Sequence, residues 1–124
     1  MLLASRGMRD EPFQVLTSSR DDKLIVDVRG EVDLATAPEL TRVVEAGLDA
    51  GPVEVRRVVI DLSDVGFLDS SGLNALVQLR RLLDGREIAF RLVSPADRAI
   101  RHVFEITELT KPLHVVDSLD DALA

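Results

Sequence analysis

Residues 57–74 read R-V-V-I-D-L-S-D-V-G-F-L-D-S-S-G-L-N, and this stretch decides the class of fold. Four of its first six residues are apolar, and three of those four are β-branched. Such near-continuous apolarity is typical of a strand that is covered on both faces. A strand is therefore predicted over 57–62, followed by a short connection. From Ser70 onward a helix is predicted, because the inward residues recur at helical spacing on one stripe: Leu73, Leu76, Val77, Arg80 and Leu83.

Towards the N-terminus, two runs predict a β-hairpin. F-Q-V-L-T at 13–17 is a short candidate strand. K-L-I-V-D-V-R-G at 23–30 alternates apolar and polar residues, which is the pattern of a strand with one buried face. The turn G-E-V-D at 30–33 is predicted to end this second strand. Because the two runs are separated only by a few polar residues, we expect them to pair as antiparallel neighbours.

Turn residues and periodicity predict five further elements. They are a helix that starts with Thr36 as N-cap and Glu39 in a capping box and stops at Gly51-Pro52, a strand at 87–93, a helix opened by Ser94 as N-cap and Pro95, a strand at 113–116, and a helix at 118–123 capped by Ser118. The order is β-β-α-β-α-β-α-β-α. Alternating strands and helices imply parallel strands with right-handed crossovers, so the leading hairpin makes the sheet mixed but mostly parallel.

Length and composition fit one globular domain. The chain has 124 residues, 46% of them hydrophobic and 30% charged. We interpret residues 1–11 as a flexible N-terminal tail and 12–124 as the domain, and Met1 and Met8 are both possible starts. The chain has no cysteine, which excludes disulfides and thiolate chemistry and fits a cytoplasmic protein. A net charge of −7 argues against direct binding to nucleic acid, and no apolar run approaches the roughly 20 residues that span a membrane.

Motifs of catalysis are absent from the sequence. D-S-S-G at 69–72 is not the G-x-S-x-G of a nucleophile elbow, and the chain has neither G-x-x-x-x-G-K-[ST] nor G-x-G-x-x-G. His102 and His114 are the only histidines, and they are not at the spacing of metal ligands. We therefore expect a protein that is not an enzyme and has no cofactor and no metal site.

D-S-S-G at the start of a helix has a simple explanation as a cap. Asp69 or Ser70 would accept a hydrogen bond from a free N–H group, which is worth about 1 kcal/mol. Two details go beyond that explanation: three polar residues stand in a row where one suffices, and Gly72 costs up to ~1 kcal/mol in a helix relative to alanine. A glycine there is useful where another group must approach the backbone closely.

Several segments together resemble the STAS domain in its small bacterial form, the anti-sigma factor antagonist. The likeness covers residues from about 12 to 124. It rests on V-V-I-D-L-S-D-V-G-F-L-D-S-S-G-L-N-A-L at 58–76, G-E-V-D at 30–33 with Pro38 after it, F-E-I-T-E-L at 104–109 and V-V-D-S-L-D-D-A-L at 115–123. Two residues depart from the family pattern, which often has glycine at both places. Glu108 bears on the end of the preceding helix, and Asn74 on the helix that would face a partner.

The resemblance implies a single α/β STAS domain with a mixed sheet of about five strands and about four helices. It also implies a switch, in which the unphosphorylated protein binds an anti-sigma factor and thereby frees a sigma factor. That anti-sigma factor would be a serine kinase of the histidine-kinase-like ATPase type. It would phosphorylate Ser70, the serine directly after Asp69, and so end the binding, and a phosphatase would reset the switch.

Residues near Ser70 are the candidates for partner contacts: Asp69, Ser71, Gly72, Asn74, Asp33 and Glu31. For Asp69 capping is the simpler role, for Asp33 and Glu31 a solvated acidic turn is about equally plausible, and Ser71 is either a cap or a second acceptor. Ser63 is a weaker rival acceptor. We expect a monomer or a weak dimer. The competing hypothesis is a STAS module without a sigma-pathway role, serving as a scaffold or as a cytosolic accessory of a transport complex.

Overall fold

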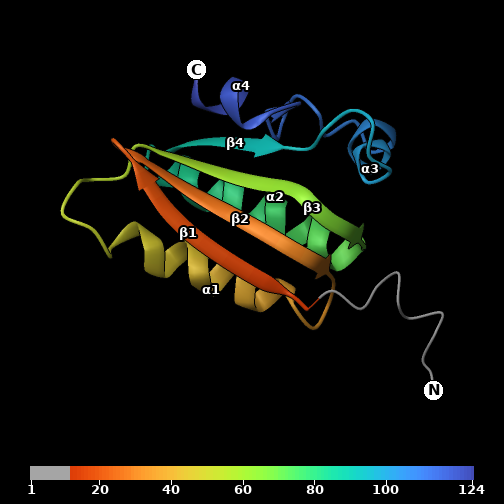
Figure 1. Cartoon of the computed structure of the whole chain (residues 1–124), viewed down its shortest axis with the longest axis horizontal. Coiled ribbons are helices and arrows are strands. Elements are labelled where there is room, and N and C mark those ends of the chain that lie inside the picture. Colours follow the sequence, from red (N-terminus) through yellow and green to blue (C-terminus); the bar gives the residue numbers. More distant parts are fainter. Residues whose placement is uncertain (1–11) are drawn as a thin grey trace.

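The computed structural model describes residues 12–124 and has a five-stranded mixed sheet in the order β1-β2-β3-β4-β5 (Figure 1). The strands are β1 (Gln14–Arg20), β2 (Lys23–Val32), β3 (Arg57–Leu68), β4 (Ala89–Val93) and β5 (Val115–Val116). β1 is antiparallel to β2, and every later pair is parallel. The predicted fold class, hairpin and element order are confirmed. The predicted tail at 1–11 lies outside the described residues.

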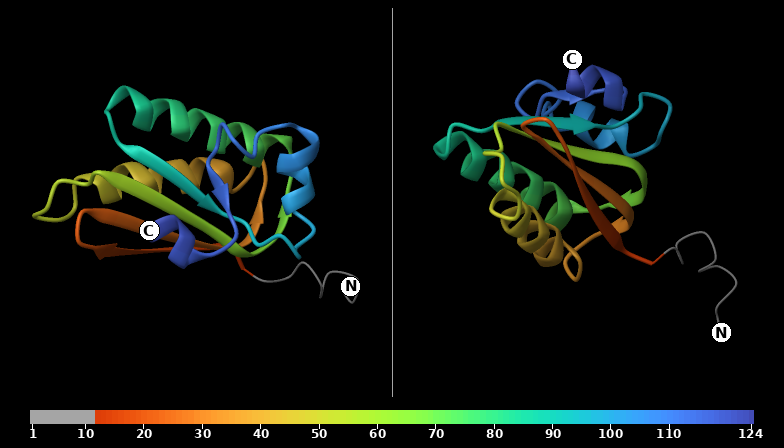
Figure 2. Two further views of the ribbon diagram at one scale, coloured as in Figure 1. Left: turned by 90° about the horizontal axis from the view of Figure 1, so that it is seen from above. Right: turned by 60° about the vertical axis from the view of Figure 1, so that its left-hand side comes forward.

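Helices lie on both faces of this sheet, as the two views of Figure 2 show. The helices are α1 (Ala37–Leu48), α2 (Ser70–Gly85), α3 (Arg101–Ile106) and α4 (Leu119–Leu123). α1 and α2 lie side by side on one face, and α4 lies on the other (Figure 1). Right-handed crossovers explain this arrangement, because a sheet built in one direction places successive crossover helices on the same face.

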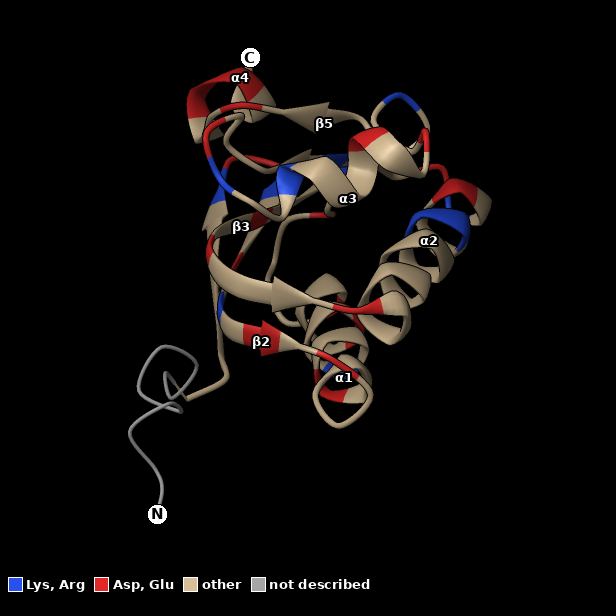
Figure 3. Ribbon diagram, turned by 90° about the vertical axis from the view of Figure 1, so that its right-hand side faces the viewer, with Lys and Arg blue, Asp and Glu red and all other residues tan. Residues whose placement is uncertain are grey.

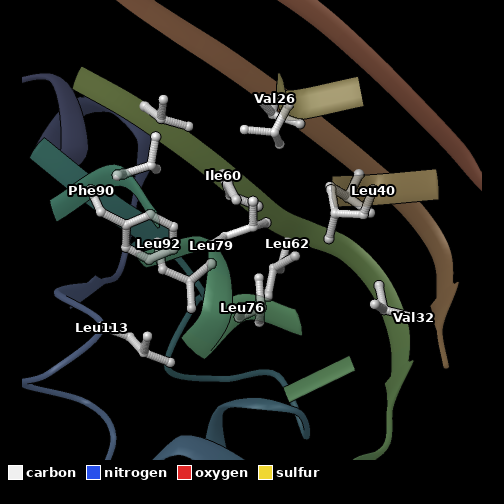
Figure 4. Close-up of a cluster of buried hydrophobic side chains, with 14 of the residues drawn as sticks. Val26, Val32, Leu40, Ile60, Leu62, Leu76, Leu79, Phe90, Leu92 and Leu113 are labelled. Carbon is white, nitrogen blue, oxygen red and sulfur yellow. The ribbon is translucent and has the colours of Figure 1, made fainter. Parts of the chain in front are cut away.

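The core lies mainly between the sheet and the pair α1 and α2. Figure 4 shows aliphatic side chains of β2 and β3 meeting those of both helices, with Phe90 of β4 beside them. On β3, Val58 and Ile60 belong to this cluster, whereas Val59 packs in a smaller cluster with Val93 and Ala122 of α4. β3 is therefore covered on both faces over this stretch, as its continuous apolarity predicted.

β3 is longer than predicted, and the expected connection before α2 does not exist. The strand continues through S-D-V-G to Leu68, so that only Asp69 separates it from α2. Two register shifts against β2 make this possible, so that residues 61–68 of β3 run beside residues 27–32 of β2. Such bulges admit residues that break the apolar pattern, which is why the sequence suggested an early end. The predicted turn at 30–33 is likewise mostly the last part of β2, where Gly30 has a φ of 94°.

The predicted capping box at the start of α1 is wrong. Thr36 itself has helical backbone angles, and its hydroxyl accepts from the N–H of Asp33 at 2.9 Å and donates to the carbonyl of Glu31 at 2.8 Å. Glu39 instead accepts a hydrogen bond from Arg42 at 3.0 Å. This hydrogen bond, with the charge of Arg42, holds the pKa of Glu39 below its ordinary value. Thr36 therefore stabilises the turn before the helix through these two hydrogen bonds. Glu39 takes no part in that turn and lies on the exposed face of α1.

The predicted cap at Ser94 is also wrong, because α3 begins only at Arg101. Ser94 continues the pairing of β4 with β5: its N–H donates to the carbonyl of Val116 at 2.9 Å, and the residue is fully buried. A residue before proline favours the extended conformation, which suits the end of a strand better than the start of a helix. The last strand is shorter than its prediction for a local reason, since His114 has a φ of 51° and leaves only Val115–Val116 in the sheet.

Two glutamates, and no glycine, take the left-handed conformation after helices in the described part of the chain. Gly85 is the last residue of α2, and Glu87, two residues later, has a φ of 59°. After α3, Glu108 has a φ of 60°, and the N–H of Leu109 returns to the carbonyl of Phe104 at 2.8 Å. Glu108 therefore completes the C-terminal cap in the conformation that glycine adopts most easily.

Replacing Glu108 by glycine is expected to raise the free energy of unfolding by about 1 kcal/mol. A left-handed non-glycine residue carries a steric cost of roughly 1–2 kcal/mol, and the entropy of glycine in the unfolded chain offsets part of the gain. Urea denaturation of the two proteins measures the difference. Glu108→Ala is the matched control, because it removes the exposed side chain and keeps the strained backbone. Equal stability of the glycine and alanine variants would contradict this explanation.

Candidate functional site

The ends of β2 and β3 bring two acidic loops to one edge of the sheet. Val32 and Leu68 are register partners, and the N–H of Asp69 donates to the carbonyl of Val32 at 3.3 Å. Asp33 follows Val32 directly, as Asp69 follows Leu68. Figure 3 shows the acidic residues at these strand ends, where α1 and α2 begin. The G-E-V-D and D-S-S-G motifs, far apart in the sequence, thus lie side by side.

Asp69 is the cap of α2. Its backbone is extended, with φ of −103° and ψ of −173°, and its carboxylate accepts from the N–H of Gly72 at 3.0 Å. This decides between Asp69 and Ser70 as the cap, with a contribution of about 1 kcal/mol. The N–H groups of Ser70 and Ser71 have no acceptor within the described part of the chain. They form the positive end of the α2 dipole, which favours a negative charge placed there.

The two serines have different surroundings. Ser70 is exposed, and its hydroxyl makes no hydrogen bond to another described residue. Ser71 is half-buried and lies with Asn74 in a groove between α1 and α2, whose other lining residues are Leu34, Ala37, Pro38, Thr41, Ala75 and Gln78. Ser63 is already engaged, because its hydroxyl donates to the carboxylate of Asp61 at 2.6 Å. Ser70 is therefore the most accessible acceptor of the three.

Gly72 is buried, and its close contacts come from the same chain. A Cβ atom at this position would lie 2.5 Å from the carbonyl oxygen of Val32 and 2.6 Å from Cδ1 of Leu68. The close approach that the sequence suggested is thus the packing of the α2 start against the end of β2. Of the other candidate contacts, Asn74 is exposed. Asp33 is half-buried, and its carboxylate accepts from the N–H groups of Ala35 and Thr36.

Leu34 is a residue of this edge that the sequence analysis missed. Its side chain is 77% exposed and lines the groove that holds Ser71. Its exposed apolar surface adds to that of Ala37, Pro38 and Ala75, which line the same groove. The available signal was an apolar residue directly after the turn G-E-V-D, outside the periodic pattern of α1.

Within residues 12–124 no group of three or more histidine, aspartate or glutamate side chains is arranged to hold a metal ion. The histidines make other contacts: His102 lies 3.3 Å from a carboxylate oxygen of Glu105, and His114 lies 3.1 Å from a guanidinium nitrogen of Arg91. None of the described helices is both long and apolar enough to cross a membrane. The groups that this edge presents are the exposed hydroxyl of Ser70, carboxylates and the N-terminus of α2.

Comparison with known proteins shows to which family this chain belongs. The model of the STAS domain matches residues 14–122. The anti-sigma-B factor antagonist of Staphylococcus aureus (strain NCTC 8325 / PS 47) is 32% identical over 103 residues, which are 83% of this chain and 92% of that protein. The chain belongs to the anti-sigma factor antagonist family of STAS domains. Its resemblance to that family is therefore confirmed.

Solved structures of antagonists share this fold. An anti-sigma factor antagonist from Mycobacterium paratuberculosis has a TM-score of 0.77 at 35% identity, covering 90% of this chain and 92% of its own. SpoIIAA, solved in unphosphorylated and in phosphorylated form, has TM-scores of 0.69 and 0.65 at 20% identity. Both comparisons cover 90% of this chain, and 93% and 96% of the respective SpoIIAA chains. At that identity the likeness to SpoIIAA concerns the fold alone.

Proposed function

We propose that this STAS domain binds an anti-sigma factor through the edge around Ser70, and so frees a sigma factor. The anti-sigma factor is a serine kinase of the histidine-kinase-like ATPase type, and it switches the antagonist off by phosphorylating Ser70. The observation that carries the proposal is the hydroxyl of Ser70 at the first turn of α2, which is exposed and makes no hydrogen bond to another described residue. The names of the relatives, which are antagonists of anti-sigma factors, support the same partner class.

The local electrostatics explain how one phosphate would act as a switch. A phosphoserine adds about −1.5 to −2 charges, and the free N–H groups at the start of α2 can donate hydrogen bonds to its oxygens without unfolding of the domain. Asp33 and Asp69 already make this edge acidic. A partner that fits the neutral hydroxyl would therefore meet both steric exclusion and an increased negative charge. The proposal predicts a change in binding and no change of fold.

Sigma-factor release tests the proposed function. The cognate anti-sigma factor and sigma factor are mixed to form their complex, and the antagonist is added in increasing amounts. Size-exclusion chromatography should show free sigma factor with the unphosphorylated protein, and an unchanged complex with the phosphorylated protein. If the unphosphorylated protein neither displaces the sigma factor nor binds the anti-sigma factor, the proposed function is wrong.

Further features belong to the same proposal. The protein acts in the cytoplasm as a binding module and as a kinase substrate, and it needs no cofactor. A phosphatase removes the phosphoryl group and so resets the switch. The protein is a monomer or a weak dimer. Asp69, Ser71, Asn74, Asp33 and Glu31 are its proposed partner contacts, and Gly72 supports them from within the fold. The alternative role as a scaffold or accessory of a transport complex predicts a different partner. Co-purification separates the two, because the partner is either a small ATPase or a subunit of a membrane complex.

A further inference from the structure

β1 forms one edge of the sheet (Figure 1), and within residues 12–124 no strand pairs with its outer side. It pairs with β2 over seven residues in a register without a bulge, whereas β5 at the opposite edge has only two residues. Edge strands are commonly protected by proline, bulges or several charges, because their free N–H and C=O groups can pair with another chain. β1, Q-V-L-T-S-S-R, has no proline and one charged residue, Arg20 at its end. The strand itself therefore lacks the features that prevent a second pairing.

The register with β2 determines which backbone groups of β1 face outward. Arg20 and Lys23 flank a two-residue loop, so they form a hydrogen-bonded pair. Along the hairpin such pairs alternate with pairs that are not hydrogen-bonded. The N–H and C=O groups of Val15, Thr17 and Ser19 therefore point away from β2. These three donors and three acceptors form the row that one further antiparallel strand can fill.

We propose that β1 pairs in antiparallel direction with β1 of a second copy of this chain, so that the two sheets join into one. A two-fold axis at Thr17 aligns all seven residues of each strand and pairs the outward donors and acceptors of both copies. In this register Arg20 lies opposite Gln14 of the second copy, so no like charges face each other directly. The edge is thus complementary to itself along its whole length.

The side chains of β1 also suit a symmetric pairing. Leu16 is 52% exposed, and its register partner is Asp27 of β2, which alternates with buried residues of the main core. Leu16 therefore lies on the face of the sheet opposite α1 and α2. In the proposed pairing the Leu16 side chains of the two copies become diagonal neighbours, about 7–8 Å apart, within reach of each other.

The distribution of charge favours a second copy at this edge. The chain has 22 acidic residues and a net charge of −7, so two copies repel each other over most of their surfaces. β1 has no acidic residue. Two copies that approach through β1 therefore bring together a part of each surface that carries no negative charge.

The dimer is expected to be weak, because seven residues of each copy are far fewer than the roughly 20–30 residues a side of a standard interface. Ser70 follows the end of β3, and β2 separates β3 from β1. The second copy extends the sheet in the opposite direction, away from Ser70. The pairing therefore leaves the proposed switch accessible and does not depend on the anti-sigma factor.

Cross-linking through a single cysteine tests the pairing, because the chain has no cysteine of its own. Thr17 is exposed, and the Cα atoms of its two copies would lie about 5.5 Å apart at the two-fold axis. Arg20→Cys is the matched control, because position 20 is also exposed on β1 but its two copies would lie about 20 Å apart. With a short bismaleimide, Thr17→Cys should form the covalent dimer about 10-fold faster or more, because its partner thiol is held nearby at a high effective concentration.

Sedimentation equilibrium of the full chain measures the dissociation constant of the dimer. Leu16→Lys places two like charges as diagonal neighbours and should raise this constant about 10-fold or more. Ile106→Lys makes the same change of charge at a side chain of α3 that is 79% exposed, and it should leave the constant unchanged. Circular dichroism identical to that of the wild type shows that each variant is folded.

Three results would overturn the proposal. They are equal rates of cross-linking for Thr17→Cys and Arg20→Cys, a wild-type chain that stays monomeric at its highest soluble concentration, and a dissociation constant that Leu16→Lys leaves unchanged. None of them bears on sigma-factor release, which is measured separately and does not depend on this edge.

Discussion

Replacing Ser70 by aspartate is expected to weaken binding to the anti-sigma factor by about 100-fold or more, which corresponds to about 3 kcal/mol. The new carboxylate lies beside Asp69 and Asp33 at an edge that is already acidic, and in a complex it would be shielded from water. An uncompensated charge buried at an interface typically costs 2–5 kcal/mol. Isothermal titration calorimetry with the purified anti-sigma factor measures the change in affinity.

Ser70→Ala is the control for this substitution. It removes the hydroxyl without adding charge, so its affinity should stay within about threefold of the wild type, well under 1 kcal/mol. Far-ultraviolet circular dichroism should be the same for all three proteins, because Ser70 is exposed and its hydroxyl holds no other described residue. Full affinity of Ser70→Asp would contradict the proposed electrostatic switch.

Replacing Gly72 by alanine is expected to lower the free energy of unfolding by about 3 kcal/mol. The new methyl group would lie 2.5 Å from the carbonyl oxygen of Val32, and backbone cannot move aside as a flexible side chain can. Overpacking of this kind costs typically 1–3 kcal/mol and sometimes more, which exceeds the gain of up to ~1 kcal/mol in helix propensity. Urea denaturation measures the loss.

Gly85→Ala is the matched control at the other end of the same helix. A Cβ atom there meets nothing within 4 Å, so the substitution should be neutral or stabilising by up to ~1 kcal/mol. A Gly72→Ala protein as stable as Gly85→Ala would show that the contact with Val32 does not restrict the helix start.

The fold was predictable because β3 and the elements after it alternate in periodicity, and each apolar run has a partner element to cover it. The predicted ends of strands and helices were wrong where a tertiary contact overrides a local sequence signal. S-D-V-G at 63–66 looks like a connection, but bulges against β2 keep it in the sheet. Ser94 looks like a cap, but its N–H pairs with Val116. In both cases a hydrogen-bond partner distant in the sequence decides the local structure.

The candidate site was predictable only in part. D-S-S-G carries a visible cap signal, and the resemblance singles out Ser70 within it. The reason why position 72 needs a glycine could not be read from the sequence. The carbonyl group that leaves no room for a side chain there belongs to Val32, forty residues earlier.

The central claim is that Ser70 is the residue that the anti-sigma factor phosphorylates. Its most direct test is mass spectrometry of the wild type, Ser70→Ala and Ser71→Ala after incubation with the cognate anti-sigma factor and ATP. We expect one phosphoryl group on the wild type and on Ser71→Ala, mapped to Ser70 by peptide fragmentation, and none on Ser70→Ala. A phosphoryl group on Ser70→Ala in the same amount as on the wild type would contradict the claim.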